Sequence, residues 1–353
     1  MDLLDNPAYN EDVSAVAALE LDWDQLRDTG LTLSGASGTV GSCLVDVIMA
    51  RNRDWGLNCA ITALARDPAG LARRFAGYGH DRRLDCLAVD VNTGPLPDGV
   101  VGGWVIHAAS QTHPLAYAAD PIATIMTNIA GTATMLDLAV RQRARRAAFW
   151  STSDIYGDNR VAGARFAEAD VGYIDCNTLR AGYPESKRTG EALCQAYRQT
   201  HGLDVVIPRL PRVYGPTMRP DDSKAVAQFM RRALAGQDIQ VKSDGRQFYS
   251  FGYVTDVVAG ILVCLLAGAP GQAYNVAAPA CDAELGQVAR LIAARRGVEV
   301  VFGQPDPAEA RGASVVRTGA MDGSKLASLG WTPAYDLAGG LERTLAILEQ
   351  LAG

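Results

Sequence analysis

The chain has 353 residues, of which 48% are hydrophobic and 20% charged, and its formal net charge at pH 7 is -6. This length suits one large domain or two modest ones, and the apolar share is enough to bury a sizeable core. The acidic balance argues against nucleic acid as the main partner, since phosphate backbones attract basic surfaces. The arginine clusters at 141–146 and 231–232 stand at expected helix C-termini, where cations complement the helix dipole.

Cysteine usage and the character of the N-terminus both indicate a cytoplasmic protein. Seven cysteines occur without any Cys-x-x-Cys pair, which is typical of reduced thiols. The first residues are acidic and polar, unlike a signal peptide, and no apolar run reaches the roughly 18 residues that a membrane span needs. We therefore expect no membrane association. His113 has no companions at metal-ligand spacing, so no metal site is expected either.

Residues 1–30 are predicted to form an N-terminal helical extension, because apolar residues between positions 13 and 19 recur at helical spacing. From Leu31 onwards, short apolar stretches alternate with helical patterns. Strands are expected from Leu31 and within 58–67, 85–91, 103–110, 147–157 and 203–210, and helices after the glycine turn at 35–41, over 122–140 and from 182. This alternation predicts a parallel sheet covered by helices on both faces, the doubly wound (Rossmann) α/β fold.

The alternation loosens after Arg209. A loop rich in proline and charge precedes an expected helix over 223–236, a buried helix over 257–269, a strand within 271–279 and a closing helix over 340–353. We assign a Rossmann domain to 31–209, with 251–277 returning to it. The remaining segments, 210–250 and 278–353, are predicted to form a smaller substrate-binding lobe over the carboxyl edge of the sheet, where doubly wound folds bind ligands.

A glycine-rich turn follows the first predicted strand and opens a helix. Gly35, Gly38 and Gly41 have the spacing G-x-x-G-x-x-G in SGASGTVGS. The first glycine permits a tight turn, the second lets backbone approach a pyrophosphate, and the third lets helix and strand pack closely. The helix N-terminus adds N–H donors and a partial positive charge. We therefore predict a dinucleotide site at this turn, with further contacts from Ser37, Thr39 and Val40.

The residues after the second predicted strand favour NADP as the cofactor, with NAD as the alternative. NAD enzymes usually carry an acidic residue there for the ribose 2′-hydroxyl, whereas an arginine suits the 2′-phosphate of NADP. Here Arg66 precedes Asp67. Arg66 is expected to stack on the adenine and contact the phosphate, while Asp67 caps the following helix. Asp90, which ends the third strand, and the adjacent Val91 are expected beside the adenine.

Tyr183 and Lys187 lie four residues apart at the start of a predicted helix, and therefore on one face. A tyrosine with an ordinary pKa of about 10 is a poor base at neutral pH, but an adjacent ammonium favours the phenolate and lowers that pKa. The pair is then suited to take a proton from a sugar or alcohol hydroxyl while hydride leaves the carbon for a nicotinamide. A third hydroxyl should fix the substrate oxygen, and the end of the fifth strand supplies Ser151, Thr152 and Ser153.

Residues 31–345 resemble the extended short-chain dehydrogenase/reductase family of nucleotide-sugar epimerases, dehydratases and decarboxylases. The motifs that carry the resemblance are GASGTVGS, HAASQTHP, STSDIYGD, YPESK, PRVYGP, YVTDVVAGI and SKLASLGWTP. The resemblance implies that Tyr183 is the catalytic base, that Lys187 is its partner and a ligand of the nicotinamide ribose, and that Thr152 holds the substrate oxygen. It also implies a structural role for Asn128, and cofactor contacts from Ala108, Ala109, Ser110, Asn128, Pro208 and Arg209.

The resemblance implies an NAD(P)-dependent enzyme that transiently oxidises C4 of a nucleotide-activated sugar, and we expect an epimerase. A nucleotide–uronic acid decarboxylase and a 4,6-dehydratase are the alternatives within the family. Ser153 and Asp154 follow Thr152, which is nearest to the Thr-Ser-Glu arrangement of the decarboxylases and GDP-mannose dehydratases. Asp154 is therefore a candidate general acid or base. A further alternative is an NADPH-dependent ketoreductase acting on a non-nucleotide substrate, whereas a non-catalytic sensor would not need the Tyr–Lys pair.

Two departures from the family's pattern concern the substrate diphosphate. Tyr249 stands in GRQFYSFGYV where the family usually has arginine, and Arg212 stands in RLPRVYGP where the family tends to have asparagine. Either Arg212 or Arg246 is expected to supply the missing charge, because a guanidinium binds phosphate bidentately. Arg180 is a second candidate for gripping an anionic substrate. Substrate contacts are thus expected from Gln111, Ser153, Arg180, Arg212 and Tyr249.

The resemblance also implies a homodimer, in which the helices at 122–143 and 183–201 of both subunits form a four-helix seam. His107 ends a predicted strand beside the cofactor, and we expect its role to be structural rather than catalytic.

Overall fold

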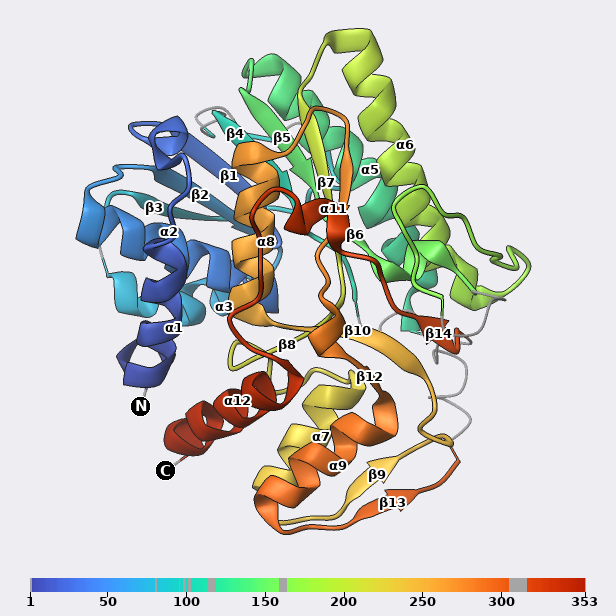
Figure 1. The fold of residues 1–353 in the computed structure, drawn as a ribbon. Coiled ribbons are helices and arrows are strands. Elements are labelled where there is room, and N and C mark those ends of the chain that lie inside the picture. The colour runs from blue at the N-terminus through green and yellow to red at the C-terminus, as the bar shows by residue number, and fades with distance from the viewer. Residues whose placement is uncertain are drawn as a thin grey trace.

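A parallel sheet forms the centre of the molecule (Figure 1). The computed structural model describes residues 2–79, 81–94, 96–97, 100, 103–112, 119–158, 164–304 and 316–352. The strand order is β11-β7-β5-β4-β1-β2-β3, with the short β6 also paired to β7. The strands are β1 Gly30–Ser34, β2 Ala60–Ala65, β3 Leu84–Ala88, β4 Trp104–His107, β5 Arg146–Phe149, β6 Ser151–Thr152, β7 Val205–Leu210 and β11 Ala273–Asn275. The predicted doubly wound parallel sheet is confirmed.

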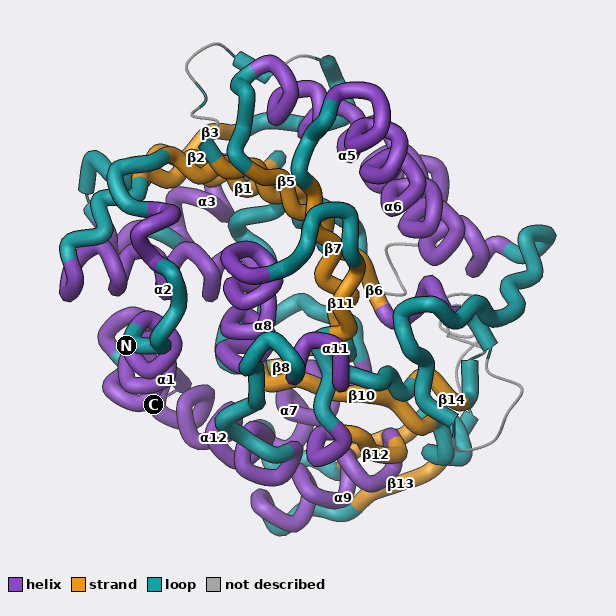
Figure 2. Tube along the Cα trace, turned by 45° about the horizontal axis from the view of Figure 1, so that its top comes forward, coloured by secondary structure: helices purple, strands orange, loops and turns teal. Residues whose placement is uncertain are grey.

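Helices cover both faces of this sheet, as the alternation of strands and helices predicts (Figure 2). α2 (Thr39–Trp55) and α8 (Val254–Ala267) lie on one face, and α5 (Pro121–Arg141) and α6 (Gly182–His201) pack together on the other. α3 (Pro68–Arg74) packs beside β3. β4 is buried along its whole length, which explains its apolar run from Trp104 to Ile106. β1 is buried from Leu31 to Ser34, although it includes the polar Thr32 and Ser34. The predicted buried helix at 257–269 is α8, and its residues from Val254 to Leu266 are all buried.

α5 has the length and apolar composition of a membrane span, which the search for apolar runs in the sequence missed. Half of its most apolar window is buried, because α5 packs along α6 and against β4. The core helix of a soluble protein has the same character. Among the described helices of 18 or more residues, α5 alone combines length with this apolarity.

A smaller lobe lies below the carboxyl edge of the sheet in Figure 1. β10 (Phe248–Tyr253) pairs with β8 (Arg212–Tyr214), β12 (Asp282–Glu284) and β14 (Thr318–Gly319), while β9 (Ile239–Val241) pairs with β13 (Val300–Phe302). Its helices are α7 Ala225–Leu234, α9 Leu285–Arg296, α11 Ser324–Ala327 and α12 Leu337–Ala352. The expected helices at 223–236 and 340–353 are α7 and α12. The strands β8, β9, β10, β12, β13 and β14 were not predicted, because most have only two or three residues and show no usable alternation.

The expected N-terminal helix is α1 (Pro7–Ala17), preceded by the 3-10 turn η1 (Leu3–Asp5) and followed by η2 (Trp23–Leu26). It packs against α2, α8 and α12, so it touches both the cofactor side and the smaller lobe. The chain ends lie close together in Figure 1, and the Asn6 amide donates to the Gln350 side chain at 2.8 Å. Further 3-10 turns are η3 Ala76–Tyr78, η4 Ser153–Tyr156, η5 Leu179–Ala181 and η6 Pro279–Cys281.

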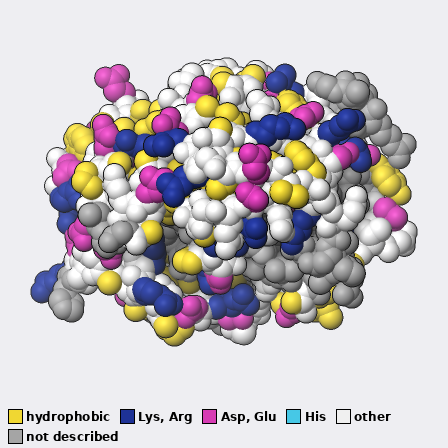
Figure 3. Space-filling view, turned by 90° about the horizontal axis from the view of Figure 1, so that it is seen from below, with side chains coloured by type: hydrophobic (Ala, Val, Ile, Leu, Met, Phe, Trp, Pro, Cys, Tyr) yellow, Lys and Arg dark blue, Asp and Glu magenta, His cyan; other side chains and the backbone are white. Residues whose placement is uncertain are grey.

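The underside of the molecule is not dominated by one kind of charge. Figure 3 shows Lys and Arg side chains interspersed with Asp and Glu on this face, which belongs to the smaller lobe. A face of this kind lacks the continuous basic surface that a nucleic-acid backbone requires.

Candidate active site

The glycine turn between β1 and α2 is as tight as its sequence suggests. Gly35 has a φ of +72°, and a Cβ there would lie 2.8 Å from the backbone of Ala108. A Cβ on Gly41 would lie 2.5 Å from the carbonyl oxygen of Gly35, so the third glycine is what lets α2 pack onto the turn. Gly38 is the N-cap of α2 and offers no side chain to its first N–H groups. Those donors suit a phosphate, so the residues fit a dinucleotide cofactor.

A cavity of about 430 Å³ opens at the carboxyl edge of the sheet, next to this turn. Most of the predicted site residues line it, although they come from seven separate segments of the chain. The predicted residues on its wall are Gly35, Ser37, Gly38, Thr39, Val40, Gly41, Arg66, Asp90, Val91, Ala108, Ala109, Ser110, Gln111, Thr152, Asp154, Tyr183, Lys187 and Arg212. The cavity therefore joins the expected cofactor site to the expected catalytic residues.

The far end of the cavity carries both basic and acidic side chains. Arg66 and Asp67 follow the last residue of β2, Ala65, and all three line the cavity. Asp67 is the N-cap residue of α3 by position, but its side chain makes no capping hydrogen bond. Asp90 uses one carboxylate oxygen to accept the backbone N–H of Asn92 at 2.9 Å, which is a local turn contact. NAD enzymes usually carry an acidic residue at the end of the second strand. Here that position is Ala65, and Arg66 follows it.

Tyr183 and Lys187 are brought together by the first turns of α6, and both are buried. The Lys187 ammonium donates to the backbone carbonyl of Trp150 at 2.7 Å and lies 4.7 Å from the centre of the Phe149 ring. Burial lowers the pKa of Lys187 to about 7, while the charge of Glu191 opposes that shift. Thr152 lies at the end of β6 and hydrogen-bonds with the Tyr183 side chain.

The expectation that Lys187 lowers the pKa of Tyr183 is wrong for this structure. Burial and the negative charge of Asp154 raise that pKa to about 12, and the hydrogen bond with Thr152 and the charges of Arg180 and Arg212 lower it only in part. The physical reason is that the Lys187 ammonium is directed to the Trp150 carbonyl. The groups around Tyr183 therefore leave its pKa above the ordinary value of about 10.

His107 ends β4 inside the molecule rather than on the wall of the cavity. Its Nδ1 lies 2.7 Å from the Ser34 hydroxyl, which links β4 to β1, and its ring stacks on Phe149. Burial, with the charge of Lys187, lowers the pKa of His107 to about 3. A buried neutral imidazole held by a neighbouring strand agrees with the structural role expected for it.

Asp154 is fixed between two arginines. Arg180 Nη2 lies 2.7 Å from one carboxylate oxygen and Arg212 Nη2 lies 2.9 Å from the other. Asp154 and Arg212 line the cavity, whereas Arg180 stands behind them and does not. The Tyr249 ring lies 4.6 Å from the Arg212 guanidinium and is also outside the cavity wall. Arg212 is consequently the cation of this cluster that a substrate can meet.

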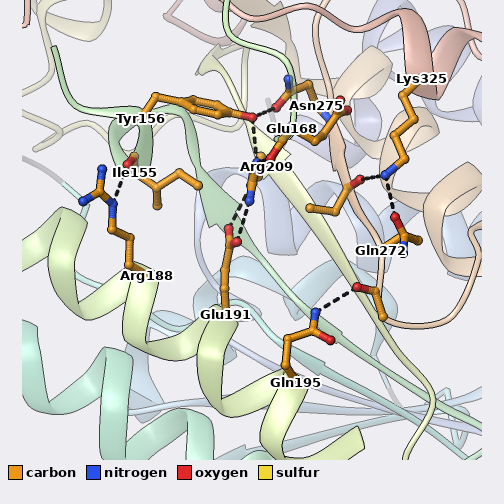
Figure 4. Close-up of polar contacts among 12 residues, drawn as sticks. Ile155, Tyr156, Glu168, Arg188, Glu191, Gln195, Arg209, Gln272, Asn275 and Lys325 are labelled. Carbon is orange, nitrogen blue, oxygen red and sulfur yellow. Dashed lines mark hydrogen bonds and ion pairs between the residues drawn. The ribbon is translucent and has the colours of Figure 1, made fainter. Parts of the chain in front are cut away.

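Five other residues expected to contact the cofactor or the substrate do not line the cavity. They are bonded to other parts of the chain or lie behind the residues that form its wall. Asn128 lies between α5 and α6, where it accepts from the Ser110 hydroxyl and donates to the Ser186 hydroxyl. Arg209 instead pairs with both carboxylate oxygens of Glu191, at 3.0 and 2.7 Å, and donates to the Tyr156 hydroxyl (Figure 4). It faces a second depression on the other side of β7. The five residues are Asn128, Ser153, Pro208, Arg209 and Tyr249.

The cavity also has walls that sequence reasoning did not name. The loop after β8 contributes Arg219, Asp221, Asp222 and Lys224, and the Thr217 hydroxyl in the same loop donates to the Thr39 carbonyl at 2.8 Å. The only signal in the sequence was the charged, proline-containing stretch itself. His113 lies outside the described residues. Among the described residues, no group of three His, Cys, Asp or Glu side chains stands close enough to hold a metal ion.

A parallel doubly wound sheet with a glycine turn, a Tyr–Lys pair and a neighbouring hydroxyl defines a dinucleotide-dependent oxidoreductase site. A sequence model described as the NAD dependent epimerase/dehydratase family matches residues 31–277. That match covers more than half of the chain. The chain therefore belongs to the NAD-dependent epimerase/dehydratase family, within the extended short-chain dehydrogenases/reductases, as its motifs predict.

The relatives and structural neighbours of the chain are nucleotide-sugar enzymes. UDP-glucuronic acid decarboxylase 5 of Arabidopsis thaliana is 32% identical over 314 residues, which is 88% of this chain and 86% of that protein. UDP-glucuronic acid decarboxylase 1 of Xenopus tropicalis is 32% identical over 89% of this chain and 71% of that protein. The structure of UDP-glucuronic acid 4-epimerase from Bacillus cereus, with UDP-glucuronic acid and NAD, matches at a TM-score of 0.77 and 20% identity, covering 92% of this chain and all of that one. That likeness shows the fold.

Proposed function

We propose that this chain oxidises C4 of a nucleotide-linked hexuronic acid and then releases the sugar carboxyl group as CO₂. The observation that carries this proposal is Arg212 on the wall of the cavity that also holds Thr152 and Tyr183. Arg180 and Arg212 both pair with Asp154, and Arg212 stands on the cavity wall, where its positive charge favours an anionic sugar. The decarboxylase relatives at 32% identity support the same substrate class.

The chemistry follows from the position of a C4 ketone relative to the C6 carboxylate, which together make a β-keto acid. Tyr183 takes the proton of the C4 hydroxyl, whose oxygen Thr152 holds. When bound, the cofactor supplies a hydride acceptor for C4 and a pyridinium charge that favours the Tyr183 phenolate. The C5–C6 bond then breaks, CO₂ leaves, and its electron pair forms the C4–C5 enolate. Solvent supplies the proton taken up at C5, and return of the hydride to C4 and of the Tyr183 proton to the C4 oxygen completes a redox-neutral reaction.

Epimerisation at C4 is the second candidate. A carboxylate gripped by Arg212 keeps its charge and so resists loss of CO₂, because that loss moves the charge into the enolate. The C4 keto sugar would then rotate within the site, and the hydride would return to the opposite face of C4. The fold shared with the Bacillus cereus 4-epimerase is compatible with this outcome.

The test is to incubate the purified protein with UDP-glucuronic acid, UDP-galacturonic acid and UDP-glucose, and to follow products by mass spectrometry and NMR. We expect a product lighter than the uronic acid by the mass of CO₂. A product of equal mass with inverted configuration at C4 would show that the reaction is epimerisation and not decarboxylation. Loss of water from UDP-glucose would indicate a dehydratase, and turnover of neither uronic acid would contradict the proposal.

We also propose that the chain prefers NADP over NAD. The support is the alanine at the end of β2, where a carboxylate would hold the ribose 2′-hydroxyl, and Arg66 beside it on the cavity wall. A guanidinium favours a 2′-phosphate through charge and stacking. The neighbour structures of the Bacillus cereus 4-epimerase and the Streptomyces venezuelae 4,6-dehydratase contain NAD, so this preference would be a departure from them.

Fluorescence titration with both cofactors tests this preference. The unmodified protein should bind NADP more tightly than NAD, and Arg66→Ala should weaken NADP binding by roughly tenfold while changing NAD binding little. Arg73→Ala is the control, because Arg73 lies on α3 outside the cavity. Equal or tighter binding of NAD by the unmodified protein would make NAD the cofactor.

A further inference from the structure

Asp154 is held in place by elements that are distant in the sequence. It belongs to η4, and its backbone N–H lies 3.2 Å from the Thr152 hydroxyl, which caps this turn. Arg180 reaches it from η5 and Arg212 from β8, each binding a different carboxylate oxygen. The Asp154 side chain is 7% exposed. A carboxylate is thus fixed two residues from the hydroxyl that holds the substrate oxygen, on the wall of the same cavity.

The two arginines differ in what they can reach. The Arg180 side chain is 13% exposed and stands behind Asp154, over the ring of Tyr183. The Arg212 side chain is 32% exposed and lines the cavity. Its guanidinium is backed by the Tyr249 ring, and the Tyr249 hydroxyl donates to the carbonyl of Val316 at 2.7 Å, which fixes that ring. Arg212 is therefore held by Asp154 and Tyr249 and also lines the cavity.

These contacts keep Asp154 ionised. Burial by itself would raise the pKa of the Asp154 carboxyl, but the charges and hydrogen bonds of Arg212 and Arg180 outweigh burial and lower it below its ordinary value. A proton on Asp154 would have to displace an ion pair at each oxygen. Asp154 is consequently a poor proton donor at neutral pH, and as a base it is already occupied.

We propose that Asp154 is a fixed counter-ion that shares Arg212 with the carboxylate of the substrate, and not the general acid or base of the reaction. This inference rests on the proposed uronic acid substrate. Asp154 is then a positioning residue that acts through Arg212. An arginine pair without Asp154 would bind the substrate carboxylate more tightly, but it would also stabilise the charge that must leave as CO₂ forms. Asp154 weakens that grip in the ground state.

Asp154→Asn separates the two roles, because it removes the charge and keeps the shape. The Kd for UDP-glucuronic acid should fall roughly fivefold, the Kd for UDP-glucose should stay within about twofold, and kcat should fall by no more than roughly tenfold. Loss of a general acid or base would instead lower kcat by about 100-fold or more, remove one limb of the pH–rate profile and leave both Kd values alone. That second result would overturn the inference.

A second variant guards against misfolding of Asp154→Asn. Arg212→Gln should raise the Kd for both ligands to different extents: the increase for UDP-glucuronic acid should be roughly tenfold larger than the increase for UDP-glucose. Equal effects on the two ligands would also overturn the inference. The matched control is Asp204→Asn, since Asp204 pairs with Arg146 at 2.8 Å outside the cavity, and it should change neither Kd.

The outcomes also separate this inference from the proposed function. If the unmodified protein binds UDP-glucuronic acid no better than UDP-glucose, the uronic acid proposal fails and the inference fails with it. The other case is that the unmodified protein binds and converts UDP-glucuronic acid while Asp154→Asn loses kcat with both Kd values unchanged, as expected for loss of a general acid or base. In that case only the inference fails.

Discussion

The surroundings of Tyr183, the proposed base, oppose its ionisation. Tyr183 is buried, and burial together with Asp154 raises its pKa to about 12. Neither Thr152 nor the two arginines offset this rise in full. Under the proposed function, a cofactor bound in the same cavity would supply positive charge that lowers the pKa of Tyr183 towards neutral.

Tyr183→Phe should lower kcat by roughly 100- to 10,000-fold, because it removes the group that takes the C4 hydroxyl proton. Cofactor binding, measured by fluorescence titration, should stay close to that of the unmodified protein. Tyr197→Phe is the control, since Tyr197 lies on the same helix but bonds to Asp137 away from the cavity. Unchanged turnover by Tyr183→Phe would remove it from the reaction.

His107 should make the protein sensitive to acid. Its pKa is about 3 in the folded chain and about 6.5 in an unfolded one. Between these values the unfolded chain binds a proton that the folded chain does not, so His107 lowers the free energy of unfolding as the pH falls below about 6.5. The slope is about 1.4 kcal/mol per pH unit for one proton.

His107→Asn should flatten this slope in urea denaturation between pH 7 and 4.5, even if the variant is less stable overall. His201→Asn is the matched control, because His201 is exposed at the end of α6. The same slope in His107→Asn and the unmodified protein would show that other groups dominate the acid response.

At the scale of the element, α6 is positioned by a close approach to the sheet. A Cβ on Gly190 would lie 2.4 Å from the Phe149 ring, so this glycine allows α6 to settle onto β5. Lys187 lies one turn earlier and reaches the Trp150 carbonyl at the end of the same strand. The helix therefore delivers Lys187 to the cavity through packing that the helical spacing alone did not reveal.

The N-terminal helix α1 joins the two parts of the molecule through two buried carboxylates. Asp12 on α1 accepts from the hydroxyls of Tyr253 and Tyr335, at 2.6 and 2.7 Å, and from Arg343 on α12. The Tyr9 hydroxyl donates to Asp46 on α2, the helix that begins at the glycine turn. α1 is thus bonded both to the cofactor-binding part and to the smaller lobe.

Asp12→Asn should lower the free energy of unfolding by about 2 kcal/mol, because it weakens several hydrogen bonds to a buried charge. Chemical denaturation measures this loss. Glu11→Gln is the control, since the Glu11 side chain is 73% exposed and pairs with the same arginine, and it should cost less than about 0.5 kcal/mol. Equal effects of the two changes would mean that the Asp12 cluster contributes no more than a surface ion pair.

At the scale of the whole molecule, α5 leaves apolar side chains on the outer surface. Ile122 is 73% exposed and Met126 is 45% exposed, one turn apart on α5. This exposed apolar strip on α5, the helix that packs along α6, is a suitable surface for the same strip of a second copy. We therefore propose that the chain forms a homodimer through α5 and α6.

Light scattering should give about twice the chain mass of 37.4 kDa. The double change Ile122→Glu and Met126→Glu should halve this mass, since it places charges in the proposed seam. Val301→Glu is the control, because Val301 is exposed on β13 in the smaller lobe and its change should leave the mass unaltered. A single-chain mass for the unmodified protein would refute the dimer.

Sequence alone determined the doubly wound sheet, the glycine turn, and the placement of Tyr183, Lys187 and Thr152 in one cavity. These features depend on local periodicity and on the fixed rule that parallel strands present their carboxyl ends on one edge. Tertiary structure alone decided two features. One is the strand pairing of the smaller lobe, where most strands are too short to show a pattern. The other is the set of ion-pair partners of the arginines. Arg209 pairs with Glu191, while Arg180 and Arg212 both pair with Asp154, from which they are 26 and 58 residues apart in the sequence. Such ion pairs depend on which segments pack together, and no spacing along the chain records that.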